Sequence, residues 1–173
     1  LTPGCFHSEW ADDDVAQGAV VSLGSRVFTA SMSHRSWGGV ARAIGRWISH
    51  VQPDFRPSRM LDLGTSSGKN LLPYREYFPD VEAHGVDVAA PLLRYGHALA
   101  EHEGVPIHFS QQNAESMDFP DGHFDLIVSS FYFHEMPVKA TRNVLRECRR
   151  LLRPGGMMVH QELPATALVD PTR

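Results

Sequence analysis

The feature that most constrains this fold is the alternation of short apolar stretches with longer segments of helical periodicity. Five apolar stretches are expected to be strands, over 59–63, 83–87, 106–109, 124–130 and 157–161. Three segments between them are expected to be helices, over 69–78, 91–102 and 137–152. Strands that alternate with helices in this way form βαβ units with right-handed crossovers. The sequence therefore predicts an α/β fold, a doubly wound and mostly parallel sheet with helices on both faces.

The first 52 residues stand outside this alternation. Residues 1–30 show no clear period and are expected to be irregular. Residues 36–51 carry apolar side chains at intervals of three and four, which predicts an amphipathic helix that ends before Pro53. We therefore divide the chain into an N-terminal helical or lid segment, 1–52, and an α/β core, 53–173. From topology alone, Arg26, His34 and Trp37 are candidates to contact a substrate.

Composition excludes several classes of function. The chain has 173 residues, 42% of them apolar, and a formal net charge of -4, which gives no general attraction to nucleic acid or anionic membranes. It has no apolar run of 18 residues and no basic stretch before an apolar one at its N-terminus. We expect a cytoplasmic protein that binds neither membranes nor nucleic acid.

Metal binding is not indicated by any motif. Cys5 and Cys148 form no metal-binding or redox spacing, and HExxH and CxxC are absent. His97 and His102 lie five residues apart, which does not place them on one face of a helix. The expectation is therefore no metal site.

The loop after the first predicted strand, "LDLGTSSGKN" over 61–70, admits three kinds of ligand. A nucleotide-binding P-loop needs four residues between its glycines and a Ser or Thr after the lysine, whereas this loop has three residues and Asn70. A dinucleotide fingerprint needs a middle glycine, and Ser66 stands there. An adenosyl-sulfonium ligand needs only a sharp turn of small residues, so this third interpretation fits best.

Polar residues after the next two strands support the adenosyl interpretation. Asp87 ends the second strand, where a carboxylate can accept hydrogen bonds from both ribose hydroxyls. Asn113 and Glu115 follow the third strand, where a polar side chain is wanted for the adenine amino group. In a parallel sheet these loops share the carboxyl edge of the strands, where ligands bind.

Four blocks, in order over about residues 59–162, resemble the class I S-adenosylmethionine-dependent methyltransferases of the small-molecule type. "MLDLGTSSGKN" is similar to the family's (D/E)xGxGxG motif, and "AHGVDVAAPLLRYGHALA" to its ribose-binding segment. "NAESMDFPDGHFDLIVSSFYFHEMP" resembles DAxxLPFPDxSFDxVxSxxxLHHxP. "VLRECRRLLRPGGMMVHQE" resembles LxExxRVLKPGGxLxIxE. The resemblance implies a Rossmann-like core that binds S-adenosylmethionine and releases S-adenosylhomocysteine.

The resemblance also implies a role for each matching residue. The methionine end of the cofactor would be surrounded by Asp62, Gly64, Thr65, Ser66 and Gly68. Asp87 would hold the ribose hydroxyls, Val88 would pack on the adenine, and Asn113 and Ala114 would meet its edge. Ser129 and Ser130 would face the amino acid part and the acceptor.

Two departures from the family pattern bear on activity. Ser66 replaces a glycine, and Asn113 replaces the common aspartate, although its carbonyl oxygen can still accept a hydrogen bond.

His134 is the candidate general base, acting on a small-molecule methyl acceptor. The alternative function is a non-catalytic adenosyl-binding or interaction domain derived from a methyltransferase.

The family sheet has two further C-terminal strands, for which the sequence has no counterpart. The fifth strand is therefore expected to be an open edge, which is prone to association. We expect a second copy of the chain or the remainder of a longer chain to cover it.

Overall fold

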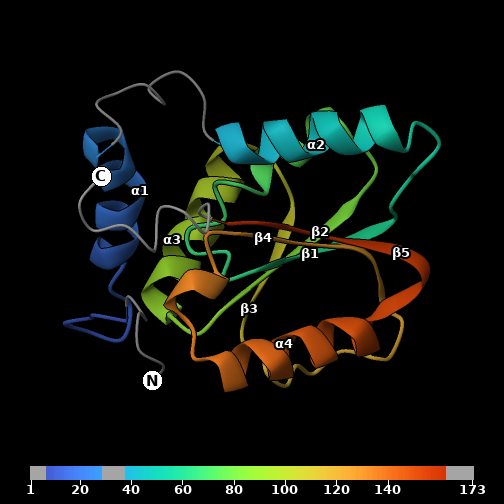
Figure 1. The fold of residues 1–173 in the computed structure, drawn as a ribbon. Coiled ribbons are helices and arrows are strands. Elements are labelled where there is room, and N and C mark those ends of the chain that lie inside the picture. Colours follow the sequence, from blue (N-terminus) through green and yellow to red (C-terminus); the bar gives the residue numbers. More distant parts are fainter. Residues whose placement is uncertain (1–6, 29–37, 163–173) are drawn as a thin grey trace, which may run out of the picture.

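The computed structural model describes residues 7–28 and 38–162, and these form one five-stranded sheet (Figure 1). Its order is β3-β2-β1-β4-β5, and every pairing is parallel. The strands are β1 (Arg59–Leu63), β2 (Glu82–Asp87), β3 (Ile107–Gln111), β4 (Phe124–Ser130) and β5 (Leu152–Gln161). The chain winds outward from β1 to β3 and then returns to place β4 on the other side of β1. The predicted doubly wound parallel sheet is confirmed.

Helices cover both faces of the sheet (Figure 1). The helices are α1 (Ala16–Phe28), α2 (Gly39–Val51), α3 (Ala90–His102) and α4 (Val138–Leu151), with short 3-10 helices η1 (Leu72–Glu76) and η2 (Phe133–Glu135). Figure 1 shows α2 and α4 on opposite faces of the sheet. No helix within the described residues has the length and apolar character needed to cross a membrane.

Each face of the sheet has its own apolar core, because alternate residues of a buried strand point to opposite faces. The core under α2 includes Ile44, Ile48, Met60, Leu126 and Val128. The core under α4 includes Leu61, Ile127, Val144, Cys148 and Leu151. Helix α2 thus shares a core with the sheet. The boundary that we predict at residue 52, between the N-terminal segment and the α/β core, therefore falls between two elements that pack on each other.

The prediction of irregular structure over residues 1–30 is wrong, because α1 occupies 16–28. This helix packs on α3 through Gly18, where an added Cβ would lie 2.3 Å from the Cβ of Tyr95. Arg94 of α3 also donates hydrogen bonds to the Asp14 carbonyl and the Glu9 carboxylate, at 2.8 Å each. Among the candidate substrate contacts, the side chain of Arg26 and all of His34 and Trp37 lie outside the described residues.

Two further sequence expectations differ from the structure. The segment 69–78 contains the 3-10 helix η1 in place of an α-helix, with successive i→i+3 hydrogen bonds at Leu71, Tyr74 and Tyr77. The sequence "RPGG" (153–156) lies within β5 as an irregularity and does not precede the strand as a turn. Between Phe124↔Leu152 and Leu126↔Met157, β5 advances by five residues while β4 advances by two. Gly155, at φ +80°, accommodates this bulge.

A buried carboxylate joins the starts of three strands. Asp125 of β4 is 2% exposed, and its Oδ2 accepts hydrogen bonds from the Ser58 N–H at 2.5 Å, the Ser58 hydroxyl at 2.6 Å and the Arg59 N–H at 2.8 Å. Its Oδ1 forms an ion pair with Arg153 of β5. Burial opposes ionisation, but the hydrogen bonds from Ser58 and Arg59 hold the pKa of Asp125 below its ordinary value. The network ties β1, β4 and β5 together at their amino-terminal ends, on the side of the sheet opposite the carboxyl ends of the strands.

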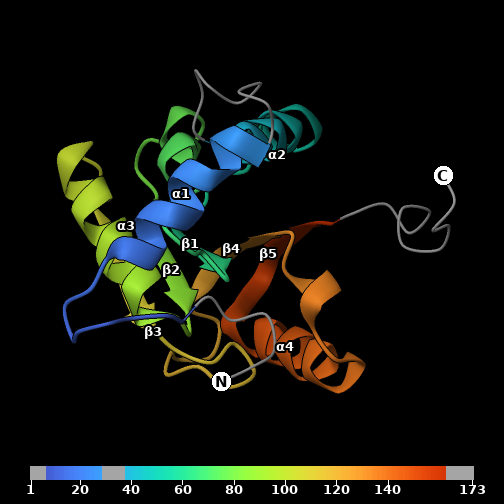
Figure 2. The ribbon, with the colours of Figure 1, turned by 90° about the vertical axis from the view of Figure 1, so that its left-hand side faces the viewer.

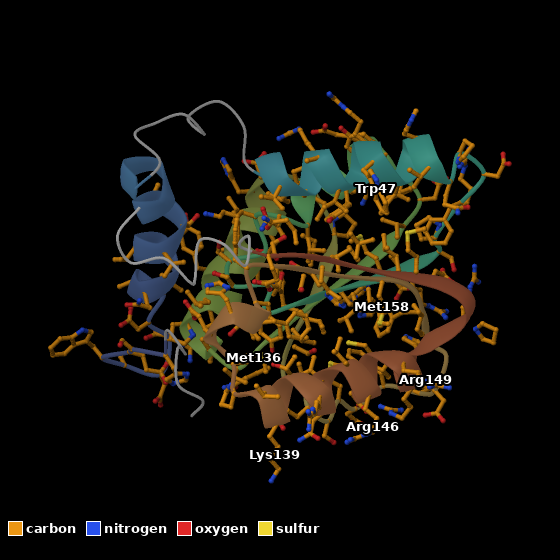
Figure 3. The ribbon with its side chains drawn as sticks, in the orientation of Figure 1. Trp47, Met136, Lys139, Arg146, Arg149 and Met158 are labelled. Carbon is orange, nitrogen blue, oxygen red and sulfur yellow. The ribbon has the colours of Figure 1, made fainter. Side chains whose placement is uncertain are left out.

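Basic side chains of α4 are divided between structural contacts and solvent. Arg150 binds Glu147 and Asp121 and also donates to the carbonyls of Met117 and Phe119. Lys139 and Arg146 extend from α4 away from the sheet (Figure 3). The cluster of arginines in this helix therefore secures the segment before β4 as well as covering the helix surface.

Candidate functional site

The candidate site lies where β1, the central strand, and its neighbour β4 end side by side. They are paired from Met60↔Leu126 to Leu63↔Ser129, so the loops that follow them leave the sheet at the same edge. The winding direction of the sheet reverses between these two strands, which is where open α/β sheets bind ligands. Figures 1 and 2 place α1 on this same side of the molecule.

Two glycines give the loop after β1 its sharp turn. Gly64 and Gly68 have φ values of +61° and +68°, which favour glycine. Close packing adds a second reason, because a Cβ at Gly64 would lie 2.4 Å from the ring of Tyr132 and one at Gly68 would lie 2.5 Å from the ring of Phe109. The glycine positions are therefore fixed by backbone conformation and by neighbouring aromatic rings together.

Ser66 adopts the same left-handed conformation without being a glycine. Its φ is +56°, a conformation that costs a residue with a side chain about 1–2 kcal/mol. Its N–H donates to Oδ2 of Asp87 at 2.9 Å, which links the loop to β2. The Oγ atoms of Ser66 and Ser67 are buried and have no hydrogen-bond partner among the described residues. These two hydroxyls therefore have unused hydrogen-bonding capacity within the described part of the chain.

Asp62 is the buried acid of the site. It is 3% exposed, and its Oδ2 accepts a hydrogen bond from the hydroxyl of Thr65 at 2.9 Å. Burial raises the pKa of Asp62 to about 7, and the nearby negative charge of Asp87 adds to the rise. Asp62 therefore changes its charge near neutral pH.

Asp87 ends β2 next to this loop. Its Oδ1 accepts the Ala89 N–H at 2.9 Å, and its Oδ2 accepts the Ser66 N–H. Burial raises its pKa, while those backbone hydrogen bonds lower it. Each carboxylate oxygen retains a lone pair for a further donor. Val88, the next residue, is half-buried and accepts a hydrogen bond at its carbonyl from Gln111.

The two predicted adenine-edge residues differ in their surroundings. Asn113 is exposed, and its Oδ1 accepts the Glu115 N–H at 3.0 Å, as in an Asx turn. Ala114 is buried in the core under α4. The structure thus uses the Asn113 carbonyl oxygen within the turn and leaves its amide group exposed.

The two serines that end β4 point to opposite faces of the sheet. Ser129 is fully buried, and its hydroxyl lies 2.9 Å from Nδ1 of His160, its partner on β5. Ser130 is half-buried on the other face. The site therefore does not bring the two hydroxyls together.

Sequence reasoning missed Glu162, which anchors the loop after β4. Its Oε1 accepts the N–H groups of Tyr132 at 2.7 Å and Phe133 at 2.6 Å, and its Oε2 lies 3.0 Å from Nδ1 of His134. Burial opposes ionisation, but the hydrogen bonds from Phe133 and His134 hold the pKa of Glu162 low. The available signal was the final glutamate of the fourth sequence block. Glu162 sets the orientation of the His134 ring.

Asp62 gives a testable dependence of stability on pH. Its pKa is 3.8 in an unperturbed carboxyl and about 7 in the folded chain. Between these values the folded state holds a proton that the unfolded state has released, so stability falls as pH rises through this window. Asp62→Asn is expected to raise the free energy of unfolding by about 4 kcal/mol at pH 8 and by less than about 1 kcal/mol at pH 4.

Urea denaturation at pH 4, 6 and 8 measures this difference. Asp118→Asn, which makes the same change at an exposed aspartate, is the control and should alter stability equally at all three values. If the free energy of unfolding of Asp62→Asn depends on pH as that of the wild type does, the Asp62 carboxyl has an ordinary pKa in the folded chain.

Comparison with known proteins supplies a family for this site. Residues 60–156, more than half of the chain, match the family described as "Methyltransferase domain". The chain is 36% identical over 108 residues to a demethylmenaquinone methyltransferase of Thermus thermophilus, covering 62% of this chain and 48% of that protein. It is 30% identical to the ubiquinone/menaquinone biosynthesis C-methyltransferase UbiE of Vibrio campbellii, covering 78% and 52%.

A solved structure agrees with the sequence relatives. The YcgJ protein of Bacillus subtilis has a TM-score of 0.57 and 28% identity, covering 68% of this chain and 50% of that one. The chain spans about half the length of the curated relatives it matches. The matched residues include the glycine loop, Asp87 and the segment after β4 described above. This chain belongs to the family of class I S-adenosylmethionine-dependent methyltransferases.

Proposed function

We propose that the chain binds S-adenosylmethionine at the carboxyl edge of its sheet and transfers the methyl group to a small molecule. The observation that carries this proposal is the pair of acids, Asp62 and Asp87, on neighbouring strands beside a glycine loop. In the described part of the chain, their carboxylates accept hydrogen bonds only from backbone and hydroxyl groups. A cationic ligand that bears hydroxyl groups would satisfy both acids.

The residues present fit this cofactor. Asp87 has lone pairs free for the ribose hydroxyls, and the unpartnered hydroxyls of Ser66 and Ser67 lie in the loop assigned to the methionine end. Asp62, ionised, would stabilise the ammonium group of that end. The other assignments, of Gly64, Thr65, Gly68, Val88, Asn113, Ala114, Ser129 and Ser130, stay as the family resemblance gives them.

When bound, the cofactor supplies a methyl group on an already activated sulfonium. The task left to the protein is to hold the acceptor in line and exclude water, which lowers barriers by about 7–11 kcal/mol in well-oriented reactions. We assign His134 as a base for acceptors that lose a proton, because Glu162 holds its Nδ1 and so assigns the role of base to Nε2, which lies 3.6 Å from Oε1 of Glu135. This arrangement of carboxylate and imidazole is the usual way to fix a catalytic tautomer.

The acceptor that we propose is a quinone-like ring. The Thermus and Vibrio relatives are named as demethylmenaquinone and ubiquinone/menaquinone C-methyltransferases. Phe131 is 44% exposed at the end of β4, and its ring meets that of His134 edge-on at 6.4 Å between centroids. Helix α1, on the same side of the molecule, supports the proposed lid role of the N-terminal segment (Figure 2).

A non-catalytic adenosyl-binding domain is the second candidate, and Ser66 is the observation that favours it. The family motif has glycine at this position, whose φ of +56° suits glycine, and the serine adds strain to the loop. Such a domain would bind the cofactor and its product without turnover.

Calorimetry with S-adenosylmethionine and S-adenosylhomocysteine, followed by turnover assays with labelled methyl groups, tests both candidates. We expect both ligands to bind and methyl transfer to a hydroquinone acceptor in preference to amine and carboxylate acceptors. Binding without transfer to any acceptor would favour the second candidate. A folded chain that binds neither ligand would refute both.

A further inference from the structure

Three metal-ligating side chains meet on the α4 face of the sheet, away from the candidate cofactor site. Glu82 and His84 are two residues apart on β2 and therefore point to the same face. His108 is the partner of His84 in register on β3. Two adjacent strands thus place two imidazoles and one carboxylate next to one another.

The distances among these groups are close to those of a metal site. Nε2 of His84 lies 3.1 Å from Oε1 of Glu82, and Nε2 of His108 lies 3.8 Å from the same oxygen. One ligand atom from each residue lies within 4.8 Å of the others. Metal–ligand bonds of about 2.0–2.2 Å in a tetrahedron place ligand atoms about 3.3–3.6 Å apart. Binding of an ion would require side-chain rotations that bring the ligand atoms to this spacing from their present separation of up to 4.8 Å.

Neighbouring groups hold the ligands in this arrangement. The His84 side chain is 12% exposed, and its ring packs edge-on to Phe124 at 5.3 Å and stacks on His108 at 4.8 Å between centroids. Arg59 donates to Oε2 of Glu82 at 3.1 Å, which leaves Oε1 facing the imidazoles. Support of this kind orients the ligands of metal sites in general.

We propose that Glu82, His84 and His108 bind one divalent transition-metal ion of the Zn²⁺ class. Two imidazole nitrogens with one carboxylate oxygen suit Zn²⁺, Co²⁺ and Ni²⁺, whereas Mg²⁺ prefers oxygen ligands alone. The fourth position is left to water or to His123, whose ring lies 6.0 Å from that of His84. This proposal departs from the sequence expectation of no metal, because strand register, and not sequence spacing, brings the histidines together.

The ion would have a structural role. His84 is three residues before Asp87 on β2, which separates the metal site from the ribose position by about 10 Å at the rise of a strand. The three ligands bridge β2 and β3, and β3 is an edge strand of the described sheet. Metal binding would therefore fasten that edge and raise the stability of the fold.

Titration of the chelator-treated full chain with Co²⁺ and Zn²⁺ tests the proposal. We expect one equivalent of Co²⁺ to bind with the visible absorption of a nitrogen- and oxygen-ligated site, Zn²⁺ to displace it, and Mg²⁺ to do neither. Zn²⁺ should also raise the thermal midpoint. His108→Ala and Glu82→Gln should each weaken Co²⁺ binding by at least about tenfold, the loss seen even when a partner of a ligand is removed.

The control is His50→Ala, which removes an exposed histidine of α2 and should leave binding unchanged. Because the His108 side chain is 62% exposed, its loss should not unfold the chain, and circular dichroism with S-adenosylhomocysteine binding checks this. The proposal is overturned if the wild type takes up no Co²⁺ equivalent. It is equally overturned if His108→Ala and Glu82→Gln bind Co²⁺ like the wild type, or if His50→Ala weakens binding as much as they do.

Discussion

Replacing Asp87 by alanine is expected to weaken the binding of S-adenosylhomocysteine by about 100-fold or more. The ribose hydroxyls of the ligand would lose two hydrogen bonds to the carboxylate. Hydrogen bonds to a charged group are worth about 1.5–3 kcal/mol each. Titration calorimetry measures the change. Asp80→Ala, at an exposed aspartate in the turn before β2, is the matched control and should bind like the wild type.

Asp87 also holds the N–H groups of Ser66 and Ala89, so its loss loosens the loop as well. A ligand that lacks the 2′-hydroxyl separates the two effects. The wild type should bind 2′-deoxy-S-adenosylhomocysteine about tenfold more weakly than the parent compound, and Asp87→Ala should bind the two equally. If the variant still prefers the hydroxylated ligand by the same factor, Asp87 acts on the loop and not on the ribose.

Asp125→Ala is expected to give the largest loss of stability, about 3 kcal/mol or more. The change leaves the N–H groups of Ser58 and Arg59 and the Arg153 guanidinium without their shared acceptor. Removing one member of a buried charged network costs about 3–5 kcal/mol. Urea denaturation measures the effect, and the slope of the transition checks that both proteins unfold in the same manner.

The control for this variant is Asp121→Ala. Asp121 also pairs with an arginine, but its side chain is 81% exposed, so its loss should change stability by less than about 0.5 kcal/mol. The low pKa of Asp125 means that its contribution is present above the ordinary carboxyl pKa and is lost as pH falls through the folded value. The difference between wild type and Asp125→Ala should therefore shrink in acid. Equal losses for the two alanine variants would contradict the role assigned to burial.

The elements that sequence reasoning predicted well are those whose burial is continuous. The ranges 59–63 and 124–130 were predicted with the bounds the structure gives, because central parallel strands are apolar on both faces. Helix α1 was missed because its contact with α3 is made by Gly18, while its apolar Val20 and Leu23 are exposed. Because glycine has no apolar side chain, a contact made by glycine does not appear in the pattern of apolar residues from which a helix is predicted.

The candidate site was predictable to the extent that strand ends mark it. Asp62 and Asp87 follow from the rule that ligands bind at the carboxyl edge, and the structure places both there. Glu162 and the pair of His84 with His108 were not found, since their partners lie 28 or 24 residues away in the sequence. Contacts of this kind depend on strand register, which a single sequence does not specify.

The convergence of three groups on Glu162 makes the loop after β4 a cooperative unit. The N–H groups of Tyr132 and Phe133 and the His134 ring share the Glu162 carboxylate, which follows β5. Displacing that carboxylate therefore releases all three groups together. By thermodynamic linkage, an acceptor that holds His134 in place also favours the present position of the β5 end, and the converse holds equally. If His134 contacts the acceptor as proposed, whatever packs against the end of β5 would influence how tightly the acceptor is bound, without touching it.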